Sequence, residues 1–325
     1  MGGIGIDRAR LLLLVGFLVV ALGGYASIDV QILGVGNLTS MAVFAVEVGI
    51  LALGQTFVIC GGDGGVDLSV GAIAALSQVL LGLVLKNHLP WGIGICAALC
   101  AGAVMGLVNG LAYAVLRIPS IIVTLATMFA FYGLALVLTG GINIDLTSSS
   151  PDFLAIGQGS VAGLPFQVLL IYLPVFLACA YLQLFTTFGR GLYLTGTNDL
   201  AARLAGIEVD RLRCLTFVIA GVLSGLAGCV SAARLGTARP DASETGNLLS
   251  IAIVVLGGAD IFGGDGSVVG TALATMVIAV VDYGLSYNNF NPIYQAGVIG
   301  VILIAAVVAQ NLFRLRRRGR RQPQR

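Results

Sequence analysis

The sequence has 325 residues, of which 58% are hydrophobic and 10% are charged, and its mean hydropathy is +1.01. Soluble domains carry about 25% charged residues, and a chain of this length cannot enclose so much apolar surface in one core. The composition therefore excludes an ordinary soluble protein and predicts an all-α integral membrane protein, since lipid accepts apolar side chains on every outer face. The 46 glycines fit this prediction, because small residues let membrane helices pack closely.

Apolar stretches of about 20 residues, the length that crosses a bilayer, follow one another along the chain. A polar loop at 140–165 and a basic tail at 314–325 lie outside them, and we treat 1–325 as a single transmembrane domain. The first stretch follows Arg8 and Arg10, and we predict a retained helix rather than a cleaved signal peptide, because further spans come after it. We expect a polytopic bundle of about ten spans, with approximate limits 8–27, 41–60, 66–85, 91–116, 119–139, 166–186, 214–233, 248–263, 267–287 and 293–312.

Positive residues are distributed unequally between the two sides of this bundle. With an internal N-terminus, the cytoplasmic segments hold Arg8, Arg10, Arg117, Arg190, Arg203, Arg211, Arg213 and the arginines of the tail. The opposite side holds Lys86, Arg234 and Arg239. Because positive residues are retained in the cytoplasm, we expect both termini there. The tail is interpreted as an anchor near anionic lipid headgroups, and not as a nucleic-acid site.

Two glycine-rich segments echo each other in the two halves of the chain. Segment 61–66 reads GGDGGV and segment 263–268 reads GGDGSV, and each interrupts a pair of hydrophobic stretches. Matching breaks of this kind place discontinuous helices near the membrane centre of transporters. The pattern favours two related halves with glycine-broken helices, and a pair of tight turns is the alternative. The break residues are Gly62, Gly64, Gly264 and Gly266.

Polar residues inside spans are costly to bury, so each needs a role or a partner. Amide, hydroxyl and carboxylate groups can exchange hydrogen bonds with a hydroxyl-rich solute, which makes them candidates for a solute pathway. The alternatives are that Asn109, Thr124 and Thr127 bond only across helices or to their own helix, and that Asp67 and Ser69 cap a helix. The candidates are Glu47, Gln55, Asp67, Ser69, Asn109, Thr124 and Thr127.

The largest predicted cytoplasmic loop, 187–213, contains a short amphipathic helix. Asp199 stands at its positive end and Gly206 follows its last turn, so the helix is well capped. Small side chains at 201 and 202 let the surface of another protein come close, which favours a docking helix; a cytoplasmic loop can also contain such a helix without docking anything. The residues assigned to docking are Asn198, Asp199, Ala201, Ala202, Arg203 and Gly206.

Motifs for chemistry by this chain are absent from the sequence. It has no phosphate loop of the GxxxxGK[ST] type, so a partner must hydrolyse any ATP. The single histidine, His88, argues against a metal site, and an intramembrane enzyme would need a facing nucleophile and base. The spans lack the multi-carboxylate relay that an ion-coupled carrier often shows, although such a secondary transporter remains the alternative function.

Several motifs together carry a resemblance to a known family. They are GQTFVI at 54–59, GGVDLSVG at 64–71, Asn109-Gly110, IPSIIVTLATM at 118–128, NDLAARLAGI at 198–207, ARL at 233–235 and VVLGGA at 254–259. With these motifs the chain resembles the ribose-type permease subunits of bacterial ABC sugar importers, in the branched-chain amino acid and ribose permease superfamily. It departs from many relatives at Tyr132, where they carry arginine, and at Asp63, which precedes the GVDLS motif with extra glycines.

The resemblance implies a permease of the bacterial inner membrane that imports a small polar solute, most often a sugar. In that family two permease chains, identical or paired, form the pore. Two cytoplasmic ABC ATPase subunits bind and hydrolyse ATP, and a periplasmic protein delivers the solute, so no cofactor is expected on this chain itself. The Ala201-Ala202 to Gly206 segment is similar to the ATPase-coupling loop of the family.

Overall fold

The computed structural model describes residues 8–147 and 151–291, together with 294, 297, 300, 301, 304 and 308. The described chain is a bundle of helices with two very short, two-stranded antiparallel sheets. Strand β1 (Ile144–Asp145) pairs antiparallel with β4 (Thr237–Ala238), and β2 (Ser160–Val161) pairs with β3 (Leu164–Pro165). The helices are α1 (Arg8–Ile28), η1 (Val30–Leu33), α2 (Val35–Cys60), α3 (Val70–Lys86), α4 (Trp91–Ala114), α5 (Ser120–Thr139), α6 (Pro151–Gln158), η2 (Gln167–Tyr172), α7 (Leu173–Phe185), α8 (Thr187–Thr197), α9 (Asp199–Leu204), α10 (Val209–Leu235), α11 (Gly246–Leu256) and α12 (Val268–Tyr287).

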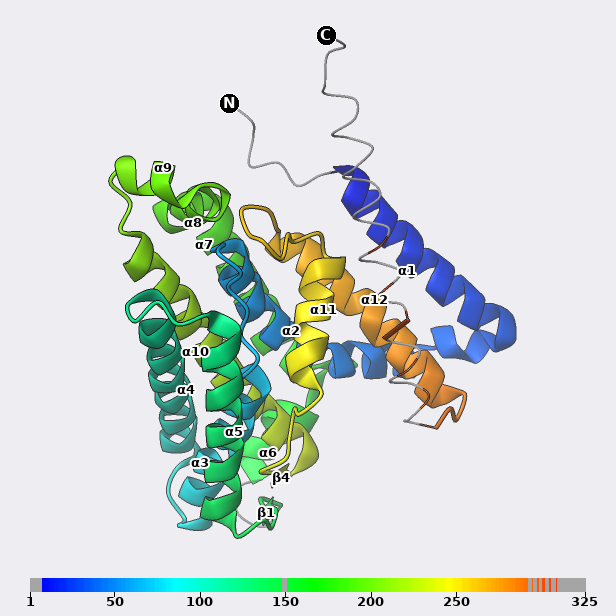
Figure 1. Cartoon of the computed structure of the whole chain (residues 1–325). Coiled ribbons are helices and arrows are strands. Elements are labelled where there is room, and N and C mark those ends of the chain that lie inside the picture. Colours follow the sequence, from blue (N-terminus) through cyan, green and yellow to red (C-terminus); the bar gives the residue numbers. More distant parts are fainter. Residues whose placement is uncertain are drawn as a thin grey trace.

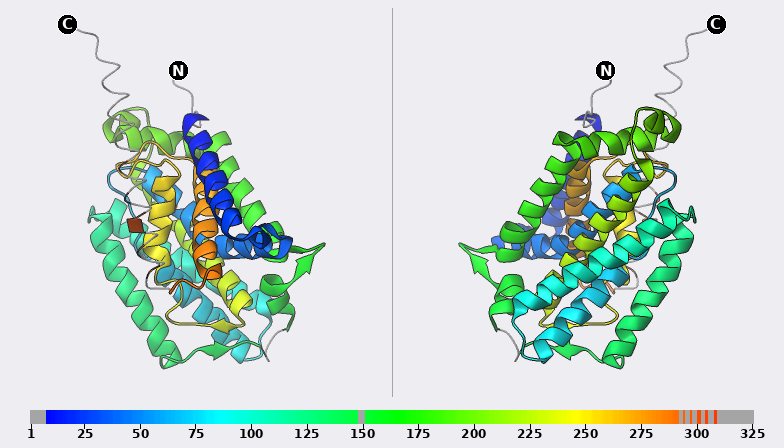
Figure 2. Two further views of the ribbon diagram at one scale, coloured as in Figure 1. Left: turned by 90° about the vertical axis from the view of Figure 1, so that its right-hand side faces the viewer. Right: turned by 90° about the vertical axis from the view of Figure 1, so that its left-hand side faces the viewer.

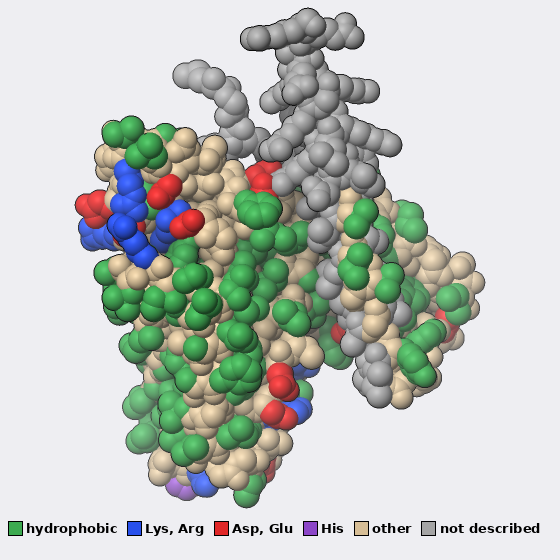
Figure 3. Space-filling view, viewed as in Figure 1, with side chains coloured by type: hydrophobic (Ala, Val, Ile, Leu, Met, Phe, Trp, Pro, Cys, Tyr) green, Lys and Arg blue, Asp and Glu red, His purple; other side chains and the backbone are tan. Residues whose placement is uncertain are grey.

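The two ends of the bundle differ in what they carry. Helices α8 and α9 lie at one end, and strands β1 and β4 lie at the other (Figure 1). The same separation holds in two further views, in which the start of α1 lies at the α9 end (Figure 2). Charged side chains gather around the α9 end and hydrophobic ones cover the middle of the visible face (Figure 3). This distribution is that of a protein whose middle faces lipid.

Seven helical segments of the described chain are long and apolar enough to cross a membrane. They cover 11–28, 35–60, 91–114, 120–139, 167–185, 209–235 and 268–287, while α3 and α11 are shorter apolar helices. The expectation of an all-α, multi-pass membrane protein is therefore confirmed. The number ten stays a prediction, because the last predicted span, 293–312, and the tail, 314–325, lie almost wholly outside the described residues.

Several predicted boundaries were wrong. The span predicted at 66–85 is helical only from Val70, and the span predicted at 248–263 ends as a helix at Leu256. Gly257 and Gly258 follow, and Gly258 has φ +102°, which a helix does not accommodate. The predicted cytoplasmic connection 187–213, in which a short helix was expected, contains α8, α9 and the first turn of α10. Hydropathy alone missed these ends because glycine and alanine count as membrane-compatible whether or not the chain is helical.

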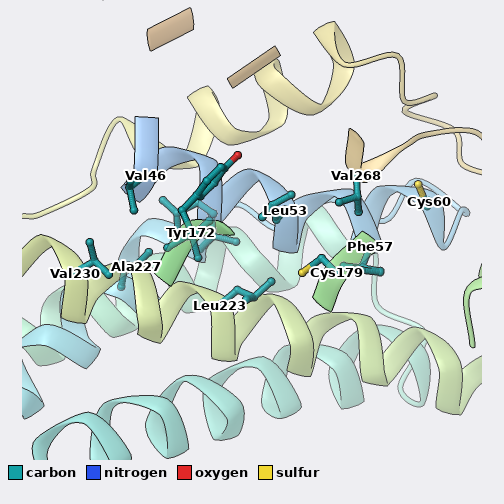
Figure 4. Packing of buried hydrophobic residues seen from close by; sticks show 14 of the residues in the cluster. Val46, Leu53, Phe57, Cys60, Tyr172, Cys179, Leu223, Ala227, Val230 and Val268 are labelled. Carbon is teal, nitrogen blue, oxygen red and sulfur yellow. The ribbon is translucent and has the colours of Figure 1, made fainter. Parts of the chain in front are cut away.

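Helix α2 is the centre of the bundle. Every residue from Gly49 to Cys60 is buried, so this half of the helix is enclosed on all sides. Around it a hydrophobic cluster joins α2 to α7, α10 and α12, with Phe57, Tyr172 and Leu223 among its large members (Figure 4). Polar groups on this half of α2 therefore face other protein groups and not lipid.

Helix α4 packs against α10 through glycines spaced four residues apart. Gly102, Gly106 and Gly110 face α10, and a methyl group added at Gly106 would lie 2.2 Å from the carbonyl oxygen of Phe217. In return, a methyl group added at Gly221 would lie 2.2 Å from the carbonyl oxygen of Gly102. Small residues at this spacing let two backbones touch, so α4 and α10 form a rigid pair.

Replacing one of these glycines should loosen the bundle. We expect Gly106→Ala to lower the thermal unfolding midpoint of the detergent-solubilised protein, since overpacking of this kind costs roughly 1–3 kcal/mol. Gly133→Ala on α5 is the matched control, because a methyl group there meets nothing within 4 Å. An equal midpoint for the two variants would show that the α4–α10 contact does not limit stability.

Candidate functional site at the glycine break

Segment 61–69, between α2 and α3, interrupts the helices in the interior of the bundle. Gly62, Asp63 and Gly64 have φ of +79°, +57° and +66°, a left-handed run in which two of the three residues are glycines. The N–H groups of Gly61 and Gly62 still bond back to α2, and the backbone groups that follow them lie outside the helical pattern until Ser69, whose carbonyl accepts from Ile73 of α3. In a protein surrounded by lipid they must be hydrogen-bonded within the chain, because an unpaired group there costs several kcal/mol.

Two hydroxyl groups of α5 bind the break. Ser120 Oγ donates to the carbonyl oxygen of Gly64 at 2.8 Å and accepts from the backbone N–H of Val66 at 3.1 Å. Thr124 Oγ1 lies 3.4 Å from the carbonyl oxygen of Val66 and 2.8 Å from that of Ser120. Both side chains are buried, and together they hold the break against the first turn of α5.

The amides of Gln55 and Asn109 bind the other half of the break. In the orientation that satisfies both of its polar atoms, the Gln55 amide donates to the backbone carbonyl of Asp67 at 3.2 Å and accepts from its N–H at 3.0 Å. Asn109 Nδ2 donates to Ser69 Oγ at 2.8 Å, and Ser69 Oγ donates to Asp67 Oδ1 at 2.6 Å. All four residues are fully buried. The structure thus brings them, with Thr124, into one network.

Asp67 accepts a backbone hydrogen bond at the start of α3, as the alternative considered from the sequence supposed. Helix α3 begins at Val70 with Ser69 at its cap position, and Asp67 Oδ1 accepts from both the N–H and the Oγ of Ser69. Among the described residues, Asp67 Oδ2 and Asn109 Oδ1 are buried acceptors without a hydrogen-bond partner. The network therefore has the capacity to accept further hydrogen bonds.

Charged and aromatic groups hold the start of the break at the α9 end. Tyr113 donates through its hydroxyl to the carbonyl oxygen of Gly62 at 3.0 Å. Arg213, on α10, donates through Nε to the carbonyl oxygen of Gly61 at 3.4 Å and through a terminal nitrogen to Asp63 Oδ2 at 3.3 Å. The Arg213 guanidinium also lies 5.9 Å from the centre of the Tyr113 ring, within the range of a cation–π contact.

The second glycine segment, 257–267, folds back against the first. The N–H of Gly264 donates to the carbonyl oxygen of Cys60 at 3.2 Å. A methyl group added at Gly263 would lie 2.1 Å from Gly62 Cα, and one added at Gly196 would lie 2.2 Å from the Cys60 carbonyl oxygen. The two segments are turns that touch each other and the end of α8. The four predicted break glycines all have positive φ: Gly62, Gly64, Gly264 and Gly266.

Two other predicted pathway residues lie apart from this network. Glu47, further back on α2, pairs with Arg234 at 2.9 Å and accepts a hydrogen bond from Ser243. It therefore ties α2 to the far end of α10. Thr127 donates to the carbonyl oxygen of Thr124 at 3.3 Å within its own helix. This is the bond to its own helix that was considered from the sequence as the alternative to solute contact.

The predicted docking segment forms the short helix α9. Asn198 Oδ1 accepts from the N–H of Ala201 at 3.0 Å and caps the helix, and Gly206 follows its end with φ +81°. Arg203 pairs with Asp199 one turn away at 3.5 Å. These contacts stabilise α9 itself, and the ion pairs of Arg203 with Asp210 and of Asp199 with Arg213 attach it to α10.

The exposed face of α9 differs from the one expected. Ala202 is only 1% exposed and packs against its own chain, so it is not available to a partner. Leu200 and Leu204, which sequence reasoning did not single out, are 68% and 82% exposed and lie one turn apart. The exposed apolar surface of α9 is therefore formed by Leu200 and Leu204, which we call its leucine face.

Sequence reasoning also missed Ser120, Tyr113 and Arg213. Two of the three carried a signal. Ser120 follows Pro119 as the first residue of α5, and Tyr113 lies four residues after Asn109, on the same face of α4. Arg213 had only the unusual position of an arginine at the start of a long apolar stretch, which the orientation argument had absorbed as a topology signal.

The chemistry of the break is exchange of neutral hydrogen bonds. Its side chains are mainly hydroxyls and amides, which both donate and accept. Among the residues that the structure describes, no group of three or more His, Cys, Asp or Glu side chains lies together in a way that could hold a metal ion. The arrangement suits handling of a polar solute or a change of backbone conformation.

A multi-pass helix bundle with a hydrogen-bonded break in its interior defines a membrane protein of the transporter class. The family model described as "Branched-chain amino acid transport system / permease component" matches residues 37–307, and the chain belongs to this family. The resemblance inferred from the motifs is thereby confirmed. No solved structure matches the chain to a significant degree.

Curated relatives cover most of the chain. It is 38% identical over 260 residues to the ribose import permease protein of Bacillus subtilis, covering 80% of each. It is 34% identical over 266 residues to the L-arabinose transport system permease protein of Escherichia coli, covering 80% of this chain and 78% of the relative. It is 31% identical over 310 residues to the autoinducer 2 import system permease protein of Yersinia enterocolitica, covering 93% and 91%.

Proposed function

We propose that this chain is the permease subunit of an ATP-driven importer that moves a small sugar or a similar polyol across the bacterial inner membrane. The relatives are named as import or transport permeases for ribose, L-arabinose and autoinducer 2. The observation that carries the proposal is the buried network at 61–69, whose hydroxyl and amide groups match a neutral, hydroxyl-rich solute without the desolvation cost of a charge. ATP is bound by a partner and not by this chain.

The partners follow from the family of import permeases to which the chain belongs. We propose a cytoplasmic ABC ATPase at the α9 end, a periplasmic solute-binding protein at the opposite end, and a second permease chain, identical or paired, beside this one in the lipid. Transport then alternates between outward-open and inward-open states, and nucleotide closure of the ATPase shifts their populations.

The proposed solute pathway passes the glycine break. Gln55, Asp67, Ser69, Asn109 and Thr124 are closed off from the surface in the described conformation. The unpartnered acceptors Asp67 Oδ2 and Asn109 Oδ1 would accept bonds from solute hydroxyls when the break opens. The remaining pathway residues, Thr127 one turn further along α5 and Glu47 nearer the other end of α2, would flank it.

Removal of one amide tests the pathway. We expect Asn109→Leu to reduce uptake of radiolabelled D-ribose by membrane vesicles while the ATPase stays bound, because about 0.5–1.5 kcal/mol of hydrogen bonding is lost. Gln55→Leu should cost more, since it also strands the backbone of Asp67. Parental uptake by both variants at matched expression would place the pathway elsewhere. Uptake that collapses with the proton gradient and ignores ATP depletion would favour the ion-coupled carrier instead.

The leucine face of α9 is the proposed seat of the ATPase. Exposed apolar residues one turn apart, on a helix fixed by its own cap, offer a preformed surface to a groove in a partner. The capping residues Asn198 and Gly206 and the pair of Asp199 with Arg203 keep that surface in place. Ala201 is also exposed beside the leucines.

Substitution of the leucine face tests this contact. We expect Leu200→Ser combined with Leu204→Ser to abolish co-purification of the ATPase with the tagged permease, while the protein still inserts into the membrane. Leu89→Ser is the matched control, because Leu89 is also exposed but lies between α3 and α4, away from α9. Retention of the ATPase by the double variant would remove α9 from the interface.

The same assignment fixes the orientation of the chain. We propose that both termini and the α9 end face the cytoplasm, as the excess of positive residues at that end supports. A periplasm-active reporter inserted after Gly163, in an open turn between β2 and β3, should be active. The same reporter after Arg325 should be silent, and the reverse pattern would invert the topology.

A further inference from the structure

Arg213 is a buried charge that touches three parts of the chain at once. Its side chain is 7% exposed. It contacts the carbonyl oxygen of Gly61 and the carboxylate of Asp63, both in the break, and lies 3.3 Å from Asp199 Oδ1 on α9. The Asp63 carboxylate is well exposed, whereas the Asp199 Oδ1 that faces Arg213 is buried although its side chain is partly exposed. Arg213 is therefore placed between the surface helix and the interior break.

The contacts continue from Arg213 into the polar network. Residues 61–66 make few regular backbone hydrogen bonds. The hydroxyl of Tyr113 donates to the carbonyl oxygen of Gly62, and that of Ser120 donates to the carbonyl oxygen of Gly64. Ser120 also binds the N–H of Val66, next to Asp67. A displacement of the start of the break must stretch these bonds in turn. Hydrogen bonds and ion pairs thus connect α9 to the buried amides without a gap, which is the physical requirement for energetic coupling.

A second connection between α8 and the break consists of backbone atoms alone. Gly196 lies one residue before the end of α8, and its backbone touches the Cys60 carbonyl and Gly264 so closely that a methyl group would lie 2.2 and 2.3 Å from them. Gly62 and Gly263 meet in the same place. Backbones in direct contact cannot absorb a movement by rotating a side chain, so α8 and both glycine turns must shift together.

We propose that Arg213, acting with this glycine junction, is the positioning residue that transmits movement of α9 to the break between α2 and α3. The proposal rests on the proposed docking of an ABC ATPase to α9. The planar guanidinium suits this role, because its donors are fixed in one plane and can hold Gly61, Asp63 and Asp199 in one geometry. A lysine, with a single rotating ammonium group, would keep the charge and lose the common geometry.

The reactivity of Cys60 offers a direct readout. Cys60 is fully buried at the junction, and its sulfur would lie 2.6 Å from a methyl group added at Gly266. In a protein whose other cysteines are replaced by alanine, N-ethylmaleimide labelling reports when the junction opens. We would measure its rate in the membrane complex with the ATPase, without nucleotide and after trapping with ATP and orthovanadate.

We expect trapping to change the labelling rate several-fold in the parent, and Arg213→Gln to remove that change while the ATPase remains bound and hydrolyses ATP. Asp63→Asn, which leaves Arg213 in place, should weaken the change and covers the case in which Arg213→Gln fails to fold. Arg211→Gln is the matched control, since Arg211 lies on the same helix, is exposed, pairs with exposed Glu208, and should keep the full change.

Three results would overturn the proposal: a parental protein whose Cys60 labelling ignores nucleotide, an Arg213→Gln variant that keeps the full response, or an Arg211→Gln variant that loses it equally. Loss of the ATPase from the parental complex would be a different result. It would contradict the docking of an ATPase, and hence the proposed function on which this inference depends.

Discussion

The structure depends on one constraint: a backbone that leaves the helical path inside a membrane protein must find all its hydrogen bonds within the chain. Segment 61–69 leaves that path directly after the fully buried half of α2. Polar side chains lie in the interior at the places where they can hydrogen-bond the backbone groups of this segment. Ser120 serves two of these groups and Gln55 serves two more. The buried polar residues are thus arranged around the break, and the break determines which helices must meet there.

Glycine makes that meeting possible in two different ways. Between α4 and α10 it removes side chains along a regular helix pair, so that the backbones touch and neither helix can shift alone. At Gly62 and Gly264 it supplies left-handed turns, and at Gly196 it lets a third segment reach both turns. The first use stiffens the bundle. The second brings the surface helix α9 and the two halves of the chain to a single point.

The sequence alone predicted the membrane class, most spans, the positions of the glycine interruptions and several members of the polar network, but not Ser120. These features depend on local composition or on the high cost of burying polar groups, so they are visible residue by residue. It could not predict which surfaces face each other. Ala202 was expected to face a partner, yet it packs inward, because the six-residue α9 lies flat on the bundle and presents Leu200 and Leu204 instead. Arg213 was taken as a topology signal because its partners at 61, 63 and 199 are distant in sequence.

The difference between neutral and charged contacts indicates which parts can move. A neutral hydrogen bond contributes a net stabilisation of about 0.5–1.5 kcal/mol, because its groups bond equally well to another donor or acceptor. The bonds of Asn109 to Ser69 and of Thr124 to the carbonyl oxygen of Val66 are of this kind and can exchange partners with a polyol at small cost. A buried guanidinium loses more when a partner is removed, because its charge is then left without compensation. Arg213 therefore keeps its partners and moves with them, whereas the neutral groups beyond it can exchange their hydrogen-bond partners. A displacement that begins at Arg213 thus breaks hydrogen bonds in the neutral interior and not at the arginine.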